Sequence, residues 1–405
     1  MDFDEYHLQR LFGHEAAESE DPERLKEYYF KTKLYNQVVN DLPLRIVVGH
    51  KGIGKSALFQ VAIDEESRSK KLTLLIKPND VQGIGKETLD FLGLISEWKS
   101  GINEIIAKKT LESFGLLHEG WRKKLNQFGG AALTFLESTF RLNEKVDFSD
   151  SKKAVIDNFL KSNKIFVYID DLDRGWEGKE WDIKRISALL NAVRDISTEN
   201  RGVLFRISLR SDVYFLSRTS DESTDKTEGS VIWYHWTNHE ILALLVKRIE
   251  SYFGRDSYEK SLLNKKQWEL MKYLSPVIEE RFMGKGHWNN APMYRVLMSL
   301  IRKRPRDIVK LLTLAGREAY NSEAEIIRTS HLERIFESYS QGRLQDTVNE
   351  YRSELPDIER LLLGMKPTKV ERRAAEGYVY STDKLLKKLK SIEEQGIFRW
   401  TKDSI

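Results

Sequence analysis

One eight-residue stretch has the residue types and the spacing of a phosphate-binding loop. Residues 49–56 read GHKGIGKS and fit the pattern G-x-x-x-x-G-K-[ST]. Glycine permits backbone angles that other side chains forbid, so successive N–H groups can turn toward an anion. The lysine would place a cation on the β- and γ-phosphates, and the serine would offer its hydroxyl to Mg²⁺. We therefore expect an ATP and Mg²⁺ site formed by Gly49, His50, Lys51, Gly52, Ile53, Gly54, Lys55, Ser56 and Ala57.

An acidic turn follows a second apolar run and supplies candidate magnesium and water ligands. Residues 165–169 read IFVYI and are followed by Asp170, Asp171 and Asp173. In a doubly wound sheet, ligands bind outside the carboxyl ends of the strands. Asp170 is placed to hold Mg²⁺ through water, and Asp171 is the better candidate to orient or deprotonate the attacking water. Asp173 competes for that second role, and a plain acidic turn is the alternative.

Three arginines are candidates for contact with the phosphates. Arg210 follows the apolar run 203–209, where a cation could sense the γ-phosphate. Arg304 and Arg306 flank Pro305 at the expected start of a helix, and a guanidinium there could clamp phosphate oxygens. The alternatives are a surface salt bridge for Arg210 and a basic solvent or nucleic-acid patch for residues 302–306.

Alternating strand and helix patterns predict an α/β fold with a doubly wound, mainly parallel sheet of the P-loop NTPase type. Short apolar runs at 44–48, 72–76, 165–169, 203–209 and 231–233 indicate strands, and 182–196 indicates a helix. Residues 22–40 read as one helix capped by Asp21, and 218–230 as a mobile polar loop. Residues 86–140 read as a helical insertion with breaks at glycines such as Gly101.

Strand patterns stop near residue 238, which suggests three domains. We expect a P-loop core at 1–237, a helical lid at 238–350 and a C-terminal unit at 351–405. The lid helices are predicted near 238–248, 266–275, 292–320 and 329–350. In the C-terminal unit, helices at 355–363 and 383–394 and a short strand at 397–400 would suit a small winged-helix unit.

Composition narrows the class of protein without identifying a partner. The 405 residues are 40% hydrophobic and contain no cysteine, which excludes disulfides, thiolate catalysis and thiolate metal sites. No apolar run approaches a membrane span, and no signal segment opens the chain, so we expect a cytoplasmic protein with no membrane partner. The net charge of +4 does not by itself indicate nucleic-acid binding. The charge is uneven, however, with an acidic stretch at 1–25 and a basic one at 364–405.

Five segments together resemble bacterial P-loop ATPases of the STAND and KAP-like group, within the additional-strand branch that also holds AAA-type proteins. These are GHKGIGKSAL, FVYIDDLDRGW, SLRSDVY, VIWYHWTNHEILALLVKRIE and RPRDIVKLL. The resemblance spans about residues 25–350 and implies an ATP-dependent molecular switch. It assigns phosphate and Mg²⁺ to Lys55 and Ser56, Mg²⁺ to Asp170, water to Asp171, a first sensor to Arg210 and a lid sensor to Arg306 or Arg304.

The resemblance also implies a biological role and partners. Such ATPases often oligomerise and serve in bacterial defence against phage, with nucleotide state controlling an effector, which here would be a separate protein. The first hypothesis is therefore an oligomeric regulatory ATPase. The alternative is a DNA-associated motor or loader that grips backbone phosphates with its basic C-terminal region. A phosphotransferase is a third, weaker reading, because no acceptor-site signature is visible in the sequence.

Overall fold

The computed structural model describes residues 2–85, 90–114, 155, 158–159, 161–220, 222–286, 288–352, 355–366, 368 and 382–397. The chain divides into two compact units. One unit comprises Met1–Trp176 and Glu180–Arg334, and the other comprises Glu177–Lys179 and Ile335–Ile405. The first unit contains both the sheet and the helices expected as a lid. The three-domain division at 237 and 350 stays a prediction.

A five-stranded parallel sheet forms the centre of the first unit. Its strands are β1 (Leu44–Val48), β2 (Leu72–Ile76), β3 (Ile165–Ile169), β4 (Val203–Leu209) and β5 (Val231–Trp233). They are arranged in the order β2-β3-β4-β1-β5, so β4 lies between the strand before the glycine loop and the strand before the acidic turn. All five strands match the predicted runs. The interposed β4 is the additional strand that the resemblance implies.

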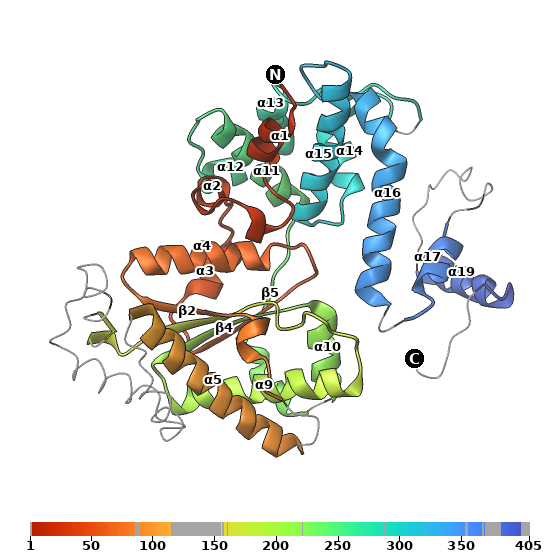
Figure 1. Ribbon diagram of the computed structural model, residues 1–405. Helices are drawn as coiled ribbons and strands as arrows, with labels where there is room; N and C mark the ends of the chain where they lie inside the picture. Colours follow the sequence, from red (N-terminus) through yellow and green to blue (C-terminus); the bar gives the residue numbers. More distant parts are fainter. Residues whose placement is uncertain are drawn as a thin grey trace. The chain divides into compact units, whose positions relative to one another are not determined.

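Helices cover both faces of this sheet, as a doubly wound fold requires. Helices α3 (Lys33–Val39) and α4 (Lys55–Arg68) lie on one face, and α5 (Phe91–Phe114) and α9 (Glu180–Glu199) lie on the other (Figure 1). Every residue of β3 and β4 is buried, which explains why these strands read as apolar runs without alternation. The predicted α/β P-loop NTPase fold is confirmed.

Three local predictions are wrong. Residues 22–40 form two helices, α2 (Pro22–Tyr28) and α3, because Tyr29 turns to extended backbone and Phe30 becomes fully buried between them. Residues 222–230 form a 3-10 helix rather than an irregular loop. Gly101 lies within α5 and does not break it. Ile84 packs against this glycine and leaves no room for a Cβ atom, so the glycine allows close packing here. Of the proposed insertion, residues 86–89 and 115–140 lie outside the described residues.

The predicted lid is a helical cluster in the same compact unit. It contains α11 (Asn238–Tyr252), α12 (Glu259–Leu263), α13 (Gln267–Leu274), α14 (Met293–Leu300) and α15 (Pro305–Asn321), with a short hairpin of β6 (Arg281–Phe282) and β7 (Ala291–Pro292). Thr237 caps α11 in a capping box with Glu240. The region 292–320 is two helices instead of one, because residues 301–304 leave the helical conformation before Pro305.

The N-terminal helix packs on the lid helices. Helix α1 (Glu5–Phe12) contacts α11 and α15, and Leu8 lies directly against Gly316. Glu5 accepts a 2.6 Å hydrogen bond from Arg317 Nε on α15. A segment at the very start of the chain is therefore attached to a helical cluster more than 200 residues later in the sequence.

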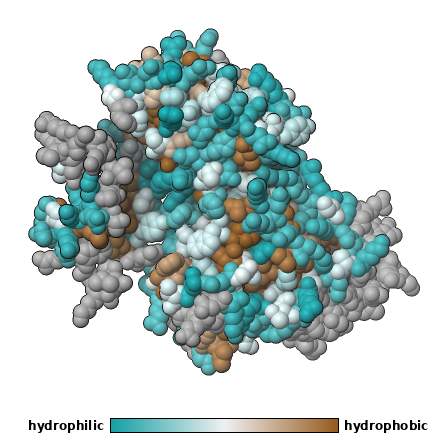
Figure 2. Space-filling model, turned by 180° about the vertical axis from the view of Figure 1, so that it is seen from behind, coloured by the Kyte–Doolittle hydropathy of each residue, from teal (hydrophilic) through white to brown (hydrophobic). Residues whose placement is uncertain are grey.

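The second unit is helical where it is described. The long helix α16 (Thr329–Tyr351) continues from the first unit, and α17 (Ile358–Gly364) and α19 (Thr382–Glu394) follow. Of the expected wing strand at 397–400, only Ile397 is among the described residues. Within the described part of the chain, no helix has the length and apolar character to cross a bilayer. Figure 2 shows a largely hydrophilic face with apolar areas, and the exposed large apolar side chains include Leu92, Phe215 and Trp233.

Candidate nucleotide-binding site

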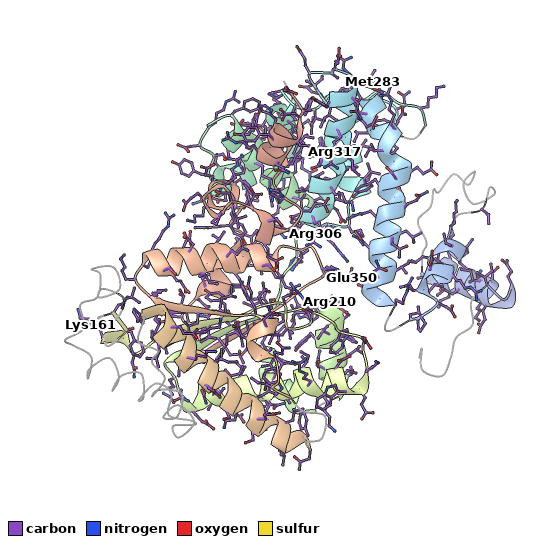
Figure 3. The ribbon with its side chains drawn as sticks, in the orientation of Figure 1. Lys161, Arg210, Met283, Arg306, Arg317 and Glu350 are labelled. Carbon is purple, nitrogen blue, oxygen red and sulfur yellow. The ribbon has the colours of Figure 1, made fainter. Side chains whose placement is uncertain are left out.

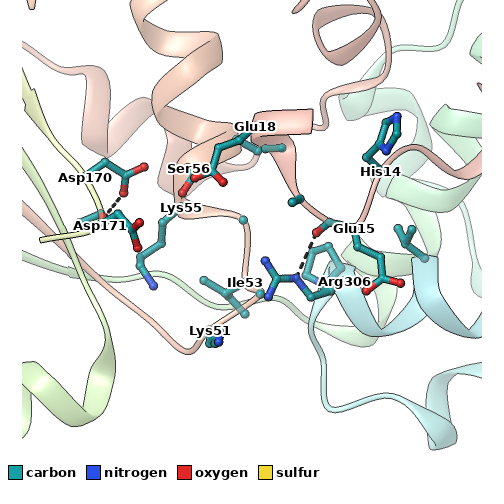
Figure 4. A pocket seen from close by; sticks show the side chains of 18 of the residues that line it. His14, Glu15, Glu18, Lys51, Ile53, Lys55, Ser56, Asp170, Asp171 and Arg306 are labelled. Carbon is teal, nitrogen blue, oxygen red and sulfur yellow. Dashed lines mark hydrogen bonds between the residues drawn. The ribbon is translucent and has the colours of Figure 1, made fainter. Parts of the chain in front are cut away.

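A cavity of about 440 Å³ opens at the carboxyl edge of the sheet. The parts of the first unit that line it include the glycine loop at 51–57, the acidic turn that follows β3, the start of α15, and the N-terminal segment at 14–18 (Figure 4). The volume lies in the range of roughly 300–1,000 Å³ that is typical of small-molecule sites. Residues separated by up to 295 positions in the sequence, His14 and Val309, therefore surround one space.

The glycine loop has the conformation that its sequence predicts. Gly52 and Gly54 have φ angles of +79° and +101°, in the region that favours glycine. Arg306 packs on Gly52, so that a Cβ atom there would lie 3.1 Å from the arginine Cβ. Lys51 to Ala57 line the cavity, while Gly49 and His50 lie behind them; Gly49 N–H donates to Leu209 O at 3.2 Å.

Lys55 lies in the polar part of the cavity lining. Its Nζ donates to the Gly49 carbonyl at 2.7 Å and more weakly to His50 O at 3.4 Å. Burial lowers the pKa of this ammonium, and the negative charges of Asp173 and Asp170 oppose that shift. A buried cation held mainly by neutral carbonyls is well placed to exchange them for phosphate oxygens.

The three aspartates of the acidic turn lie in different environments. Asp170 is 8% exposed and accepts a hydrogen bond from Ser208 Oγ on the neighbouring strand β4. Asp171 has a φ of +62°, its side chain is 36% exposed, and it accepts from Arg174 Nε at 2.7 Å. Asp173 is 8% exposed, and its Oδ2 accepts from the Arg210 backbone N–H at 3.2 Å. All three aspartates line the cavity.

The surroundings of Asp173 disfavour its charged form. Burial raises the pKa of its carboxyl, and the positive charges of Lys55 and Arg210 oppose this only in part. The acidic turn therefore includes one carboxylate whose ionisation is costly in the folded protein.

The structure distinguishes the two arginines that flank Pro305. Arg306 lines the cavity, and its Nε donates to Glu15 O at 3.1 Å (Figures 3 and 4). Arg304 is buried and donates to Lys51 O at 3.1 Å, but it is not among the lining residues. Arg210 also lines the cavity, and its Nε donates to Asp212 Oδ1 at 3.1 Å. Of the candidate lid sensors, Arg306 is thus the one that reaches the cavity.

An aromatic part of the cavity lining was not predicted from the sequence. It consists of Tyr28, Tyr29, Phe30 and Trp236, together with Arg248. Trp236 Nε1 donates to Ile53 O at 2.8 Å, and the Arg248 guanidinium lies 4.4 Å from the centroid of the Tyr28 ring. The available signal was a Tyr-Tyr-Phe run after an N-capped helix and a tryptophan just before another helix cap. The cavity lining therefore includes aromatic side chains as well as polar and charged ones.

The N-terminal wall was also missed. Residues 14–18 carry Glu15 and Glu18 and were expected to belong to a solvated acidic stretch, yet they line the cavity. Glu20 fixes this segment by accepting from the His14 backbone N–H at 2.7 Å and from Tyr28 Oη at 2.5 Å. The docking of α1 on the lid brings the segment here, and no local sequence pattern predicts that docking.

Comparison with known proteins gives distant likenesses. No family model matches the chain. It is 25% identical over 383 residues to the "Putative transposon gamma-delta 80.3 kDa protein" of Escherichia coli K12, covering 86% of this chain and 52% of that protein. It is 27% identical over 144 residues to "Allergen Alt a 2" of Alternaria alternata, covering 36% of this chain and 67% of the allergen. The chain thus spans about half the length of the transposon protein.

Among solved structures, the chain is similar to the ORC2 protein of Aeropyrum pernix in its ADPNP–ADP complexes. The identity is 12% and the TM-score is 0.38, over 88% of this chain and 80% of that one. At that score the similarity adds nothing to the fold assignment. The assignment comes from the strand order, the loop between β1 and α4, and the interposed strand β4.

The perturbed aspartate leads to a stability prediction. Replacing Asp173 with asparagine removes a carboxylate whose ionisation is unfavourable in the folded state, so the nucleotide-free protein should become more stable at pH 7. We expect an increase of about 1–2 °C in the thermal midpoint, the size that about 1 kcal/mol produces in a chain of 405 residues. Thermal unfolding followed by circular dichroism measures it.

The matched control is Asp171→Asn, which should leave the midpoint nearly unchanged because Asp171 is more exposed and paired with Arg174. The gain in Asp173→Asn should also disappear below about pH 4, where Asp173 is protonated in both the folded and the unfolded state. A lower midpoint for Asp173→Asn at pH 7 would show that its attraction to Lys55 outweighs the cost of burial.

Proposed function

We propose that this chain binds and hydrolyses ATP and that the nucleotide controls the contact between its sheet core and its lid. The observation that carries this proposal is the convergence of Lys55, Asp170, Asp173 and Arg306 on one cavity. These residues come from the glycine loop, the acidic turn and the lid helix α15. A triphosphate with its magnesium ion is the ligand that needs a cation, a carboxylate and a mobile arginine together.

The two parts of the cavity lining match the two parts of a nucleotide. Stacking and burial against Tyr29, Phe30 and Trp236 would hold a base. The loop amides and the α4 N-terminus would hold the phosphates, with Lys55 leaving the Gly49 carbonyl for the β- and γ-oxygens.

Ser56 and Asp170 fit a magnesium site. Both line the cavity and offer the hard oxygen ligands that Mg²⁺ prefers, and Ser208 orients Asp170 by a hydrogen bond. The ion, when bound, would neutralise charge on the β- and γ-phosphate oxygens. Asp171 would orient the attacking water and accept its proton, with Asp173 as the competing candidate.

Arg306 on α15 would bind the γ-phosphate, so that the position of the lid would depend on whether this phosphate is present. It already contacts Gly52 of the loop and the carbonyl of Glu15, so it links the loop, α15 and the N-terminal segment. A γ-phosphate would attract the guanidinium, and its loss after hydrolysis would release it. Arg210 would act as the first sensor from the end of β4.

The finer proposal is a regulatory ATPase of the STAND and KAP-like group that forms homo-oligomers and controls a separate effector in defence against phage. It is supported by the segments that resemble this group and by the lid arginine. Phe215 on α10 (Ser211–Ser220) and Trp233 on β5 are about half exposed, and Trp233 packs against Tyr214, so these elements offer apolar surface for a second copy.

Loss of Lys55 tests nucleotide binding directly. We expect Lys55→Ala to weaken ATP binding by at least about a hundredfold, because two phosphates lose a charge-assisted partner. Isothermal titration with ATP and Mg²⁺ measures this, and Lys33→Ala, an exposed lysine on α3, is the matched control. Ordinary ATP affinity in Lys55→Ala would refute the proposed site.

A comparison of two aspartates tests the chemistry. Asp171→Asn should retain ATP binding and lose at least about a hundredfold in turnover, since general-base groups contribute roughly that much or more. Phosphate release under single-turnover conditions measures the step. Unchanged turnover in Asp171→Asn with loss in Asp173→Asn would assign the water to Asp173.

The second candidate function is a DNA-associated ATPase. Two observations favour it: the transposon origin that the E. coli relative's name states, and the lysines Lys384, Lys387, Lys388 and Lys390 along α19. On this reading, double-stranded DNA should stimulate hydrolysis several-fold, and the stimulation should fall steeply with added salt. Turnover unchanged by DNA, together with ATP-dependent assembly in light scattering, would favour the regulatory switch.

A further inference from the structure

A second cavity of about 530 Å³ lies beyond the carboxyl ends of β2 and β3. It is lined by the segment 78–85, which follows β2, by Leu172 and Arg174 of the acidic turn, and by Trp181 and Arg185 at the start of α9. Arg174 lines both this cavity and the first one. None of the proposed ATPase roles uses the second cavity.

The charged side chains among the described residues that line this cavity have one sign, although Glu97 accepts from the Gly85 N–H and Asp171 pairs with Arg174 beside it. Its described lining residues include two arginines and no carboxylate. Arg174 is paired with Asp171, whereas Arg185 has no hydrogen bond or ion pair within the part of the chain that the structure describes. The Arg185 guanidinium lies 5.5 Å from the centroid of the Trp98 ring.

A half-buried guanidinium without a protein acceptor has N–H groups that are open to a ligand, and a bound anion would accept from them. Burial lowers the pKa of Arg185, and Asp182 on the same helix opposes this only as a more distant charge. Because the guanidinium remains charged in proteins, an anionic ligand is its natural partner.

The rest of the lining suits a flat group attached to that anion. Trp181 contributes an indole ring, and Gly83, with a φ of +91°, has nothing within 4 Å of the position where a Cβ atom would stand. Gly85, at a φ of +84°, lies against the Arg185 side chain. Guanidinium groups beside an aromatic ring and open backbone are the recognition elements for a phosphate that carries a base.

We propose that this cavity is a second nucleotide site, which takes the phosphate and base of one nucleotide unit, either free or within a single-stranded nucleic acid. Arg185 and Arg174 hold the phosphate and Trp181 stacks on the base. The site is separate from the proposed ATP site, and its binding does not require hydrolysis.

One consequence rests on the proposed function. A phosphate at Arg174 competes with Asp171 for the same guanidinium, so occupation of the second site frees the carboxylate that would orient water. Single-stranded ligand should therefore change ATP turnover in the wild-type protein and leave it unchanged in the variant Arg185→Gln. A wild-type turnover that does not respond, with binding intact, would overturn this coupling.

Binding is tested with two probes in the Lys55→Ala background, in which the first site binds nucleotide too weakly to compete, and the variants below are made and compared in that background. The probes are thymidine monophosphate and a fluorescein-labelled oligothymidylate, measured by titration calorimetry and fluorescence anisotropy respectively. Arg185→Gln should weaken binding about tenfold or more, because it removes a charge-assisted contact. Gln82→Glu adds a carboxylate at an exposed lining residue and should weaken it similarly without disturbing the fold.

The control is Arg201→Gln, which removes an exposed positive charge in the turn after α9 and should bind like Lys55→Ala alone. If both probes bind and depend on Arg185, a free nucleotide suffices; if only the oligothymidylate does, the ligand is a nucleic-acid strand. Absence of binding, or loss in Arg185→Gln without loss in Gln82→Glu, would overturn the proposal. Since the binding measurements need no hydrolysis, failure of the second site is distinguishable from failure of the proposed ATPase.

Discussion

The register of three parallel strands is the constraint on which the site depends. Val48 of β1 pairs with Leu209 of β4, and Ile169 of β3 pairs with Ile207 two residues earlier on β4. The residues that follow each strand therefore emerge at one edge: the glycine loop, the acidic turn and Arg210. A shift of one residue would turn every side chain to the other face and take the buried Arg206 and Ser208 away from their acceptors, Leu42 O and Asp170, which favours this register.

The polar part of the cavity lining is a balanced set of buried charges rather than a single ion pair. Lys55 and Asp173 are each destabilised by burial and partly stabilised by each other, while Asp170 is tied to Ser208 and Asp173 to the Arg210 backbone. Such a set costs stability in the folded protein. It can persist because the apolar strands and helices around it supply the free energy of folding, and it leaves the groups oriented before any ligand arrives.

The sequence predicted what is local and periodic. The five strands, the loop conformation and the cap at Asp21 follow from short patterns, and the structure confirms them. The missed parts depend on tertiary contacts. The extended backbone at Tyr29 and the N-terminal wall at 14–18 both come from docking between segments far apart in the sequence, so composition alone described the latter as a solvated acidic stretch. The sequence could not tell which of Arg304 and Arg306 reaches the cavity, since both flank the same proline, and only the tertiary structure distinguishes them.

Arg174 lines both cavities, and the backbone conformation of the acidic turn explains how it is placed there. Asp171 adopts a left-handed conformation, which is uncommon for a residue with a side chain, and the salt bridge to Arg174 three residues later closes the turn around it. Arg174 is two-thirds exposed, so its pairing with Asp171 is weak enough to be exchanged for another anion. Arg174 therefore orients Asp171, the candidate water ligand, and is also the residue most open to a second ligand. The strained turn that contains both residues lies between the two cavities.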